Sequence, residues 1–189
     1  MSNSTTVVPL DFKKNSDESL FEYFERIDKY FDYQNAENLV GRKKPTFPDK
    51  EGDWPTFWSQ SQAWDHDYFM KRMQAFKHAL NAITLVHPKL DSINIKYSGS
   101  GDDGEVEDIE FYDKKGKIIN ISSDDFIYKH IEHVGWWITQ DVAPGFHNNE
   151  GGQGEIDIKK DHEDLGQWKC TCDHENNTIQ VESVEVEMF

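Results

Sequence analysis

The chain has little basic charge for the acid that it carries. Of its 189 residues, 20 are Lys or Arg and 36 are Asp or Glu, which gives a net charge of −16. Residues 1–94 hold 12 basic and 14 acidic residues, whereas residues 95–189 hold 8 and 22. A negative field repels nucleic acid and attracts basic surfaces. The balance argues against direct nucleic-acid binding and leaves three uses for the acid: a basic protein partner, bound cations, or solubility alone.

Cysteine and long apolar runs are also scarce. Cys170 and Cys172 are the only cysteines, and no stretch approaches 18 apolar residues. Two positions apart on a strand, the thiols would share a face, where a disulfide between such close neighbours is strained. We therefore expect both to be reduced, as in a cytoplasmic protein. We expect neither a membrane span nor a signal peptide.

Signatures of nucleophilic catalysis and of phosphate binding are missing. The chain contains no G-x-S-x-G, the motif that exposes a serine nucleophile on a sharp turn. The glycine-rich stretch HNNEGGQGEID at 147–157 lacks the Lys-Ser/Thr of a P-loop and leads into a strand pattern. The sequence therefore gives no support to a catalytic serine or a phosphate cradle.

Helical periodicity is clear in three places. An aromatic content of 13% indicates a folded chain. Apolar residues recur at helical spacing over 17–33, 57–85 and 124–135. We expect Ser16 or Asp17 to cap the first helix, Ser122 or Ser123 to cap the third, and Gly135 to end the third. Trp58 lies off the apolar stripe of the second helix and is therefore a candidate for a surface contact.

Strand patterns fill most of the second half. Residues 93–121 predict a three-stranded meander, with the acidic turn SGSGDDG at 98–104 and a third strand at 119–121. Val106 is out of phase with the apolar residues that follow it, so we expect an irregularity near Glu107–Asp108. A bulge at Ser183 would likewise bring the valines of the last strand to one face.

Together these patterns predict an α+β fold. An antiparallel sheet of five to six strands would pack on about three helices. Residues 1–90 would form an N-terminal helical region packed on the same core, and residues 91–189 an acidic α+β domain.

Two sets of residues have the chemistry to bind metals. The carboxylates of the glycine-rich stretches suit magnesium or calcium, but their spacing does not match the twelve-residue calcium loop. His130 and His133, with His147 or His162, could hold a transition metal, as could the C-x-C-x-H cluster at 170–174. Neither histidine set has standard spacing. We favour solvated acidic turns and structural histidines, and we expect no bound metal and no cofactor.

Two motifs together resemble those of an uncharacterised domain family of bacteria and phages. GSGDDGEVEDI at 99–109 resembles the family's G-S-G-D-x-G turn, and HVGWW at 133–137 followed by NNEGGQGEIDI at 148–158 resembles its later G-W…N-[DE]-G-G-x-G motif. The resemblance extends over about residues 93–189, and the inserted ITQDVAPGF departs from the pattern. It implies a bacterial or phage origin and one α+β domain, but no activity.

The function that we expect is that of a non-catalytic acidic protein-binding module. In a phage or mobile element it would inhibit a host defence protein by docking on its basic, nucleic-acid-binding surface. The alternative is a divalent-metal-dependent hydrolase that uses the acidic glycine-rich loops. The expected contact residues are carboxylates of turns and of the last strand, with two aromatic anchors: Asp102, Asp103, Glu105, Glu107, Asp108, Trp136, Trp137, Glu150, Glu182, Glu185 and Glu187.

Overall fold

The computed structural model of the chain describes residues 12–31, 35–146, 151–164, 166–176 and 180–188, and for residues 30, 176 and 180–188 the backbone alone. The helices and strands are α1 (Leu20–Phe31), α2 (Ala36–Val40), η2 (Glu51–Asp53), α3 (Trp54–Val86), β1 (Leu90–Ser100), β2 (Asp103–Asp113), α4 (Phe126–Val142), β3 (Gly152–Lys160), β4 (Trp168–Asn176) and β5 (Gln180–Met188). None of the described helices is both long and apolar enough to span a membrane.

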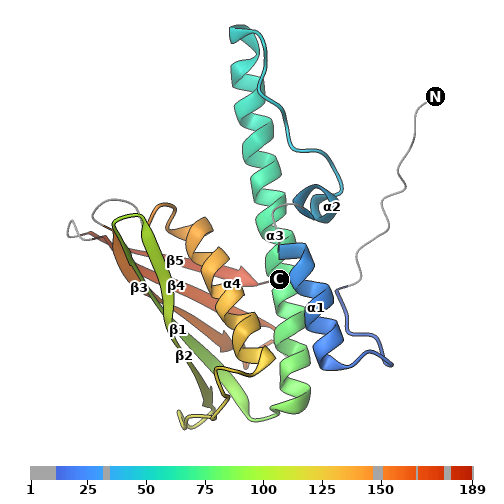
Figure 1. Cartoon of the computed structure of the whole chain (residues 1–189), viewed down its shortest axis with the longest axis vertical. Coiled ribbons are helices and arrows are strands. Elements are labelled where there is room, and N and C mark those ends of the chain that lie inside the picture. The colour runs from blue at the N-terminus through green and yellow to red at the C-terminus, as the bar shows by residue number, and fades with distance from the viewer. Residues whose placement is uncertain (1–11, 32–34, 147–150, 165, 177–179, 189) are drawn as a thin grey trace. The chain divides into compact units, whose positions relative to one another are not determined.

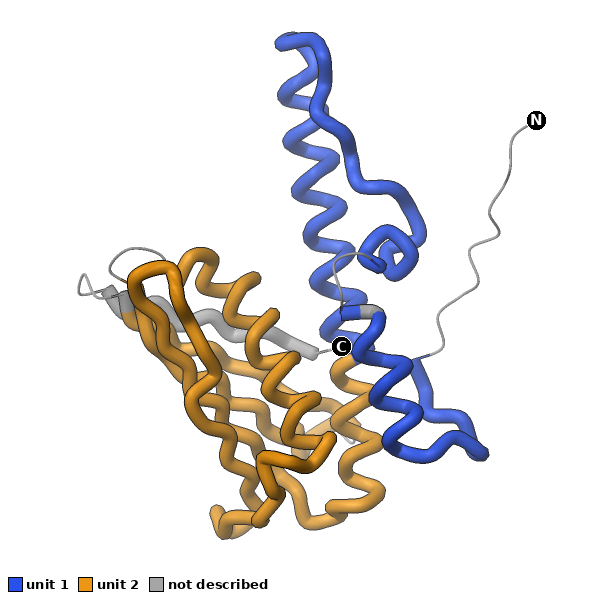
Figure 2. Tube along the Cα trace, in the orientation of Figure 1, with its two compact units in different colours: residues 1–75 blue, residues 76–189 orange. Residues whose placement is uncertain are grey.

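The chain forms two compact units, residues 1–75 and 76–189 (Figure 2). The division falls inside α3, so the last turns of that helix belong with the sheet. The sequence suggested a division near residue 90, where the strand patterns begin. The helical pattern of α3 alone gave no sign of a boundary within it.

The second unit is built on an antiparallel sheet, which confirms the predicted α+β class. Its strand order is β2-β1-β3-β4-β5. Alternate residues along β1 to β4 are buried and form the inner face: Ile93, Ile95, Tyr97, Ile109, Phe111, Ile156, Ile158, Trp168, Cys170, Cys172 and His174. α4 lies along β1 and β2 (Figure 1), and in α3 Asn81 Oδ1 accepts a hydrogen bond of 3.0 Å from the Trp168 indole. Among the described elements of the second unit, no helix covers the opposite face of the sheet (Figure 1).

The first unit contains α1, α2, η2 and the first part of α3. The Tyr68 hydroxyl of α3 donates to the Phe31 carbonyl at the end of α1, at 3.2 Å. The Trp64 indole donates to the Arg42 carbonyl at 3.1 Å. These bonds tie α1 and the segment after α2 to α3.

The acidic turn between β1 and β2 is a two-residue hairpin turn. Gly101 and Asp102 both have positive φ, at 61° and 73°. Two consecutive residues of this kind are typical of a type I′ turn, whose twist matches that of the flanking strands. The GSGDDG sequence therefore has a conformational explanation.

The predicted irregularity in β2 is confirmed. Lys96 pairs with Asp108, but Tyr97 pairs with Val106, so Glu107 is an extra residue in β2. The bulge brings Val106 into register with the buried side of β1. A Cβ at Gly135 of α4 would lie 3.6 Å from Val106, so this valine reaches the helix.

The predicted bulge at Ser183 is wrong. β4 and β5 pair in an unbroken register from Trp168↔Met188 to Asn176↔Gln180. Val184 is opposite the buried Cys172, whereas Val181 is opposite Glu175 on the open face. An alternating strand accommodates both valines without an extra residue.

The end predicted for the third long helix is also wrong, because α4 continues through Gly135 to Val142. A Cβ at Gly135 would lie 3.1 Å from Cγ2 of Ile95 in β1. That distance is tighter than ordinary contact, so glycine serves a close approach of helix to sheet. The glycine acts within the helix and does not terminate it.

Two caps and one strand also differ from expectation. α1 begins with a capping box in which Ser19 and Glu22 exchange hydrogen bonds with each other's backbone N–H, at 3.2 and 2.9 Å. α4 is capped by Asp125, whose carboxylate accepts from the Ile127 N–H at 2.8 Å. The predicted third strand of the meander is an isolated bridge between Tyr112 and Ile118.

The hairpin turn gives a first prediction. Replacing Asp102 by Val should lower the free energy of unfolding by ~1–2 kcal/mol, because a β-branched residue disfavours positive φ. Asp102→Asn should be nearly neutral, because asparagine tolerates this region. Urea unfolding of the two variants beside the parent chain measures the difference, and equal stability of both would contradict a type I′ turn.

Candidate binding face of the sheet

The open face of the sheet is acidic. It consists of the residues of β1 to β4 that alternate with the buried ones. Its carboxylates are Asp103, Glu105, Glu107, Asp108, Glu110, Glu155, Asp157, Asp173 and Glu175, and its lysines are Lys96, Lys159 and Lys169. We refer to this surface as the acidic face.

The lysines of this face lie close to carboxylates. Lys96 Nζ lies 3.7 Å from Glu110, and Lys159 Nζ lies 3.0 Å from Asp157. Lys169 pairs at 3.2 Å with Asp161, which precedes β4. The lysines therefore offset part of the acid, and a carboxylate majority remains.

Two carboxylates lie directly opposite each other. Glu155 of β3 pairs in register with Asp173 of β4, and both are exposed. Glu175 is the diagonal neighbour of Glu155 on the same face. Like charges in such positions destabilise a sheet. The fold therefore bears an electrostatic cost at this place.

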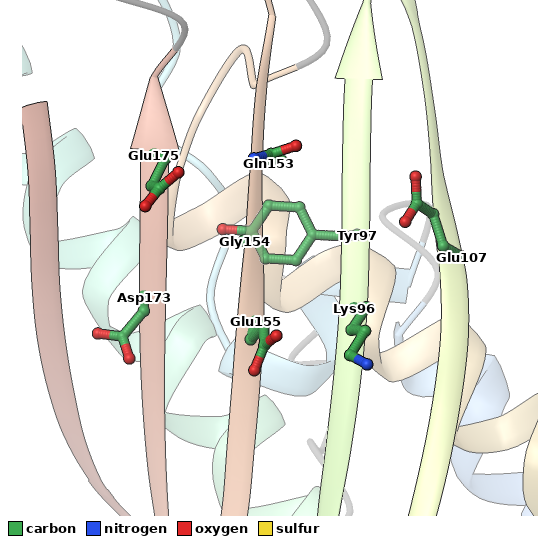
Figure 3. Close-up of a pocket in the computed structure, with 8 residues that line it drawn as sticks. All are labelled: Lys96, Tyr97, Glu107, Gln153, Gly154, Glu155, Asp173 and Glu175. Carbon is green, nitrogen blue, oxygen red and sulfur yellow. The ribbon is translucent and has the colours of Figure 1, made fainter. Parts of the chain in front are cut away.

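A shallow hollow of about 450 Å³ lies at this part of the face (Figure 3). Figure 3 shows the carboxylates of Glu107, Glu155, Asp173 and Glu175 distributed around it, with Lys96 among them. The surface can therefore surround a cationic group with carboxylate oxygens, which are strong acceptors for charged donors.

Behind the hollow, two aromatic rings fill the space left by two glycines of β3. A Cβ at Gly154 would lie 2.1 Å from the Asp173 carbonyl oxygen and 2.6 Å from the Tyr97 hydroxyl oxygen, and one at Gly152 would lie 2.5 Å from Cε1 of His174. Neither glycine could carry a side chain without a shift of its neighbours. These close approaches explain Gly152 and Gly154 of the GGQG sequence, whereas Gly151 has a positive φ and lies against the Gly99 backbone.

The two rings also bind each other. The Tyr97 hydroxyl lies 3.0 Å from Nδ1 of His174 and 3.5 Å from Sγ of Cys172. The rings are nearly parallel, with centroids 5.9 Å apart, and Phe146 packs edge-on against Tyr97 at 5.2 Å. Burial raises the pKa of the Tyr97 hydroxyl well above its usual range, so the group stays protonated and available as a donor.

Most of the predicted contact residues lie on the surface. Asp102, Asp103, Glu105, Glu107 and Asp108 are all exposed. Their placement at a turn and on an edge strand follows from the hairpin. The first of them belongs to the turn, and the others lie along β2 on the acidic face.

The predicted aromatic anchors differ from each other. Trp136 is 37% exposed, whereas Trp137 is 5% exposed and belongs to the core. Consecutive helical residues point in directions about 100° apart, so the pair cannot share one face. Trp58 is 53% exposed, as its place off the apolar stripe predicted.

The predicted glutamates of the C-terminal part are less well defined. Glu150 lies outside the described residues, and β5 is described by its backbone alone. The register places Glu185 and Glu187 opposite Thr171 and Lys169 of the acidic face, but Glu182 opposite the buried His174. The expectation that Glu182 shares a face with the other two therefore fails together with the predicted bulge.

Sequence reasoning missed three carboxylates of this face and assigned two others differently. Glu110, Asp173 and Glu175 were not named, and Glu155 and Asp157 were considered only as metal ligands. The signal was available for Glu110, Glu155 and Asp157, because they alternate with apolar residues of strands and so belong to the opposite face. The predicted residues came mainly from turns, where acidic residues are dense in the sequence. The acidic face instead combines carboxylates of separate strands.

The candidate metal ligands are divided between core and surface. His130 is buried and His133 exposed, so the pair does not share one environment. Cys170, Cys172 and His174 do share the inner face, as a regular strand requires. His162 lies 3.0 Å from Asp91. Within the described ranges, no group of three or more His, Cys, Asp or Glu side chains is arranged to hold a metal ion.

Comparisons with protein-family models, with curated proteins and with solved structures find no match to this chain. Function is therefore inferred from the chemistry of the acidic face.

The glycine packing gives a second prediction. Gly152→Ala should lower the free energy of unfolding by ~1–3 kcal/mol, because the added methyl group overpacks the site of the His174 ring. In a His174→Ala background the same change should cost clearly less, since the ring is gone. Thermal or urea unfolding of the four proteins measures this coupling.

Gly52→Ala is the matched control, since a Cβ there meets nothing within 4 Å, and its effect should be small. An undiminished cost of Gly152→Ala without the His174 ring would show that the backbone, and not the ring, requires this glycine.

The thiols give a third prediction. Cys170 and Cys172 are free and buried on the same face of β4. Burial raises the pKa of the Cys170 thiol to about 12 and also raises that of Cys172. Because the thiolate is the reactive form, a thiol reagent at pH 8 should react slowly with the native chain. Denatured without reductant, the protein should show two reactive thiols, and finding none would contradict the free state.

Proposed function

We propose that this chain is a non-catalytic binding protein that docks its acidic face on a basic surface of another protein. The observation that carries the proposal is the pair Glu155 and Asp173, held opposite each other on an open strand pair beside Glu175. A chain without a use for this charge would gain stability by neutralising one member. Retention of a destabilising arrangement is common where a surface serves binding.

The arrangement suits electrostatic docking. Carboxylates from β2, β3 and β4 extend their field beyond the surface over roughly a Debye length, about 8 Å at physiological salt. Such a field speeds the encounter with a basic partner, and the effect falls as salt rises. A partner's cations would also relieve repulsion within the face.

The surface of the partner protein would be one that otherwise binds nucleic acid. A sheet face with rows of carboxylates presents negative charge to the Lys and Arg groups that otherwise hold phosphates. In a cytoplasmic setting, and in a phage or mobile element, the partner would be a nucleic-acid-handling defence protein of the host. The chain would inhibit it by occupying its binding surface.

The fourth prediction tests this function. The face variant is Glu155→Gln/Asp173→Asn/Glu175→Gln. Its free energy of unfolding in urea should exceed that of the parent chain by roughly 0.5–1 kcal/mol, because the repulsion between carboxylates is removed. In a low-salt pull-down from bacterial lysate it should lose basic proteins that the parent chain retains. Those proteins should elute from the parent as salt rises.

The matched control is Asp124→Asn/Glu163→Gln/Asp164→Asn, which removes the same charge from exposed loop positions. This control variant should retain the same basic proteins as the parent chain. Equal losses by both variants would show a response to net charge alone and would remove the acidic face from the proposal. Unchanged retention by the face variant would do the same.

A further inference from the structure

Four aromatic rings gather at the start of α3, in the first unit. Phe47 packs on Phe57 with centroids 4.8 Å apart and on Trp54 at 5.8 Å. Trp58 packs on Phe57 at 5.2 Å and on Trp54 at 5.9 Å. We call Phe47, Trp54, Phe57 and Trp58 the aromatic patch.

The rings of the aromatic patch differ in exposure, and Trp54 is half-buried. Phe57 is 7% exposed and forms the floor, whereas Phe47 is 71% and Trp58 53% exposed. Single exposed apolar residues are ordinary, but contiguous ones mark interaction surfaces. The two exposed rings project from different segments, the loop before η2 and the first turns of α3, yet both meet the same buried ring.

Acidic residues accompany the aromatic patch. Asp49, Glu51 and Asp53 lie between its first and second rings in the sequence, all exposed, with Lys50 as the one basic residue among them. In the described part of the chain, neither Glu51 nor Asp53 takes part in an ion pair. The segment that links Phe47 to Trp54 in the aromatic patch therefore carries a net negative charge.

Two buried rings of the first unit have cationic groups of the chain packed over them. Lys44 Nζ lies over the Trp64 ring at 5.0 Å, and the Arg26 guanidinium lies over Tyr23 at 5.3 Å. Exposed aromatic faces attract ammonium and guanidinium groups, and nearby carboxylates add to the attraction. For the described residues, no such contact falls on a ring of the aromatic patch.

We propose that the aromatic patch is a second docking site, which takes an arginine side chain of a partner protein against the exposed rings of Phe47 and Trp58. Arginine fits because its planar guanidinium stacks on an aromatic ring and still donates to carboxylates at its edge. Glu51 and Asp53, which precede Trp54 in the sequence, would accept these hydrogen bonds. The site lies in the first unit and stands independently of the acidic face.

The test uses the full chain carrying the face variant, which removes three carboxylates of the acidic face and so reduces its competition for the probe. The probe is a capped peptide of alternating Gly and Arg, and its control replaces each Arg by citrulline, which is neutral and nearly the same shape. The readout is the set of six indole N–H signals in proton–nitrogen NMR, assigned with Trp54→Phe and Trp58→Phe.

The expected result, as the fifth prediction, is that the arginine peptide shifts the Trp54 and Trp58 signals and the citrulline peptide does not. Trp58→Ala should weaken binding about tenfold, ~1.4 kcal/mol. Phe21→Ala removes a comparably exposed ring, 52% exposed, from α1 and should leave the affinity unchanged.

Three results would overturn the proposal. Unmoved Trp54 and Trp58 signals would exclude the site, and equal shifts with both peptides would show stacking without charge recognition. Broadening of these signals with protein concentration, before any peptide is added, would show that a second copy of the chain occupies the patch. None of these outcomes bears on the acidic face, because the indole signals of Trp54 and Trp58 report on residues of the first unit.

Discussion

The seating of Tyr97 and His174 on two glycines of β3 is the constraint on which the sheet depends. A side chain at either glycine would collide with these rings. The two rings contact each other, Phe146 packs on Tyr97, and the Tyr97 hydroxyl also contacts Cys172 of β4. One bonded cluster thus joins β1, β3 and β4 and the segment after α4, on the side of the sheet away from water.

This buried cluster explains how the other side can be so polar. Inner-face burial supplies the main favourable term for the fold, while the open face bears the repulsion between carboxylates. Neighbouring residues of each strand point to opposite faces, so the polar side chains of the open face do not enter the packing of the inner face. The acid of the second half is therefore compatible with a stable sheet, provided that the glycines stay free of side chains.

Sequence patterns predicted the fold class, the long helices and the irregularity of β2, because each follows from periodicity. The same phase argument succeeded at Val106 and failed at Val181. Val106 has a helix to contact on the inner face, and a bulge brings it there. Val181 pairs with Glu175 in a regular register, and no bulge is required there. Phase alone indicates a mismatch, and tertiary contact decides whether the backbone corrects it.

The glycines were harder to interpret, and so was the site. Gly135 was expected to end a helix, and it instead allows the helix to approach Ile95. The GGQG run was weighed as a ligand loop, and two of its glycines make room for rings from other strands. Such roles depend on residues distant in sequence, as does the acidic face itself, which collects carboxylates from three strands.

The bulge at Glu107 has a further consequence for how the molecule behaves in a crowded solution. β2 is at one margin of the sheet, and such a margin is a template on which another chain can add a strand. A local twist and a row of charged side chains both prevent that addition. β2 has the two together, since its bulge lies among Glu105, Glu107 and Asp108. The chain can thus expose a strand of eleven residues and still resist growth into fibrous aggregates.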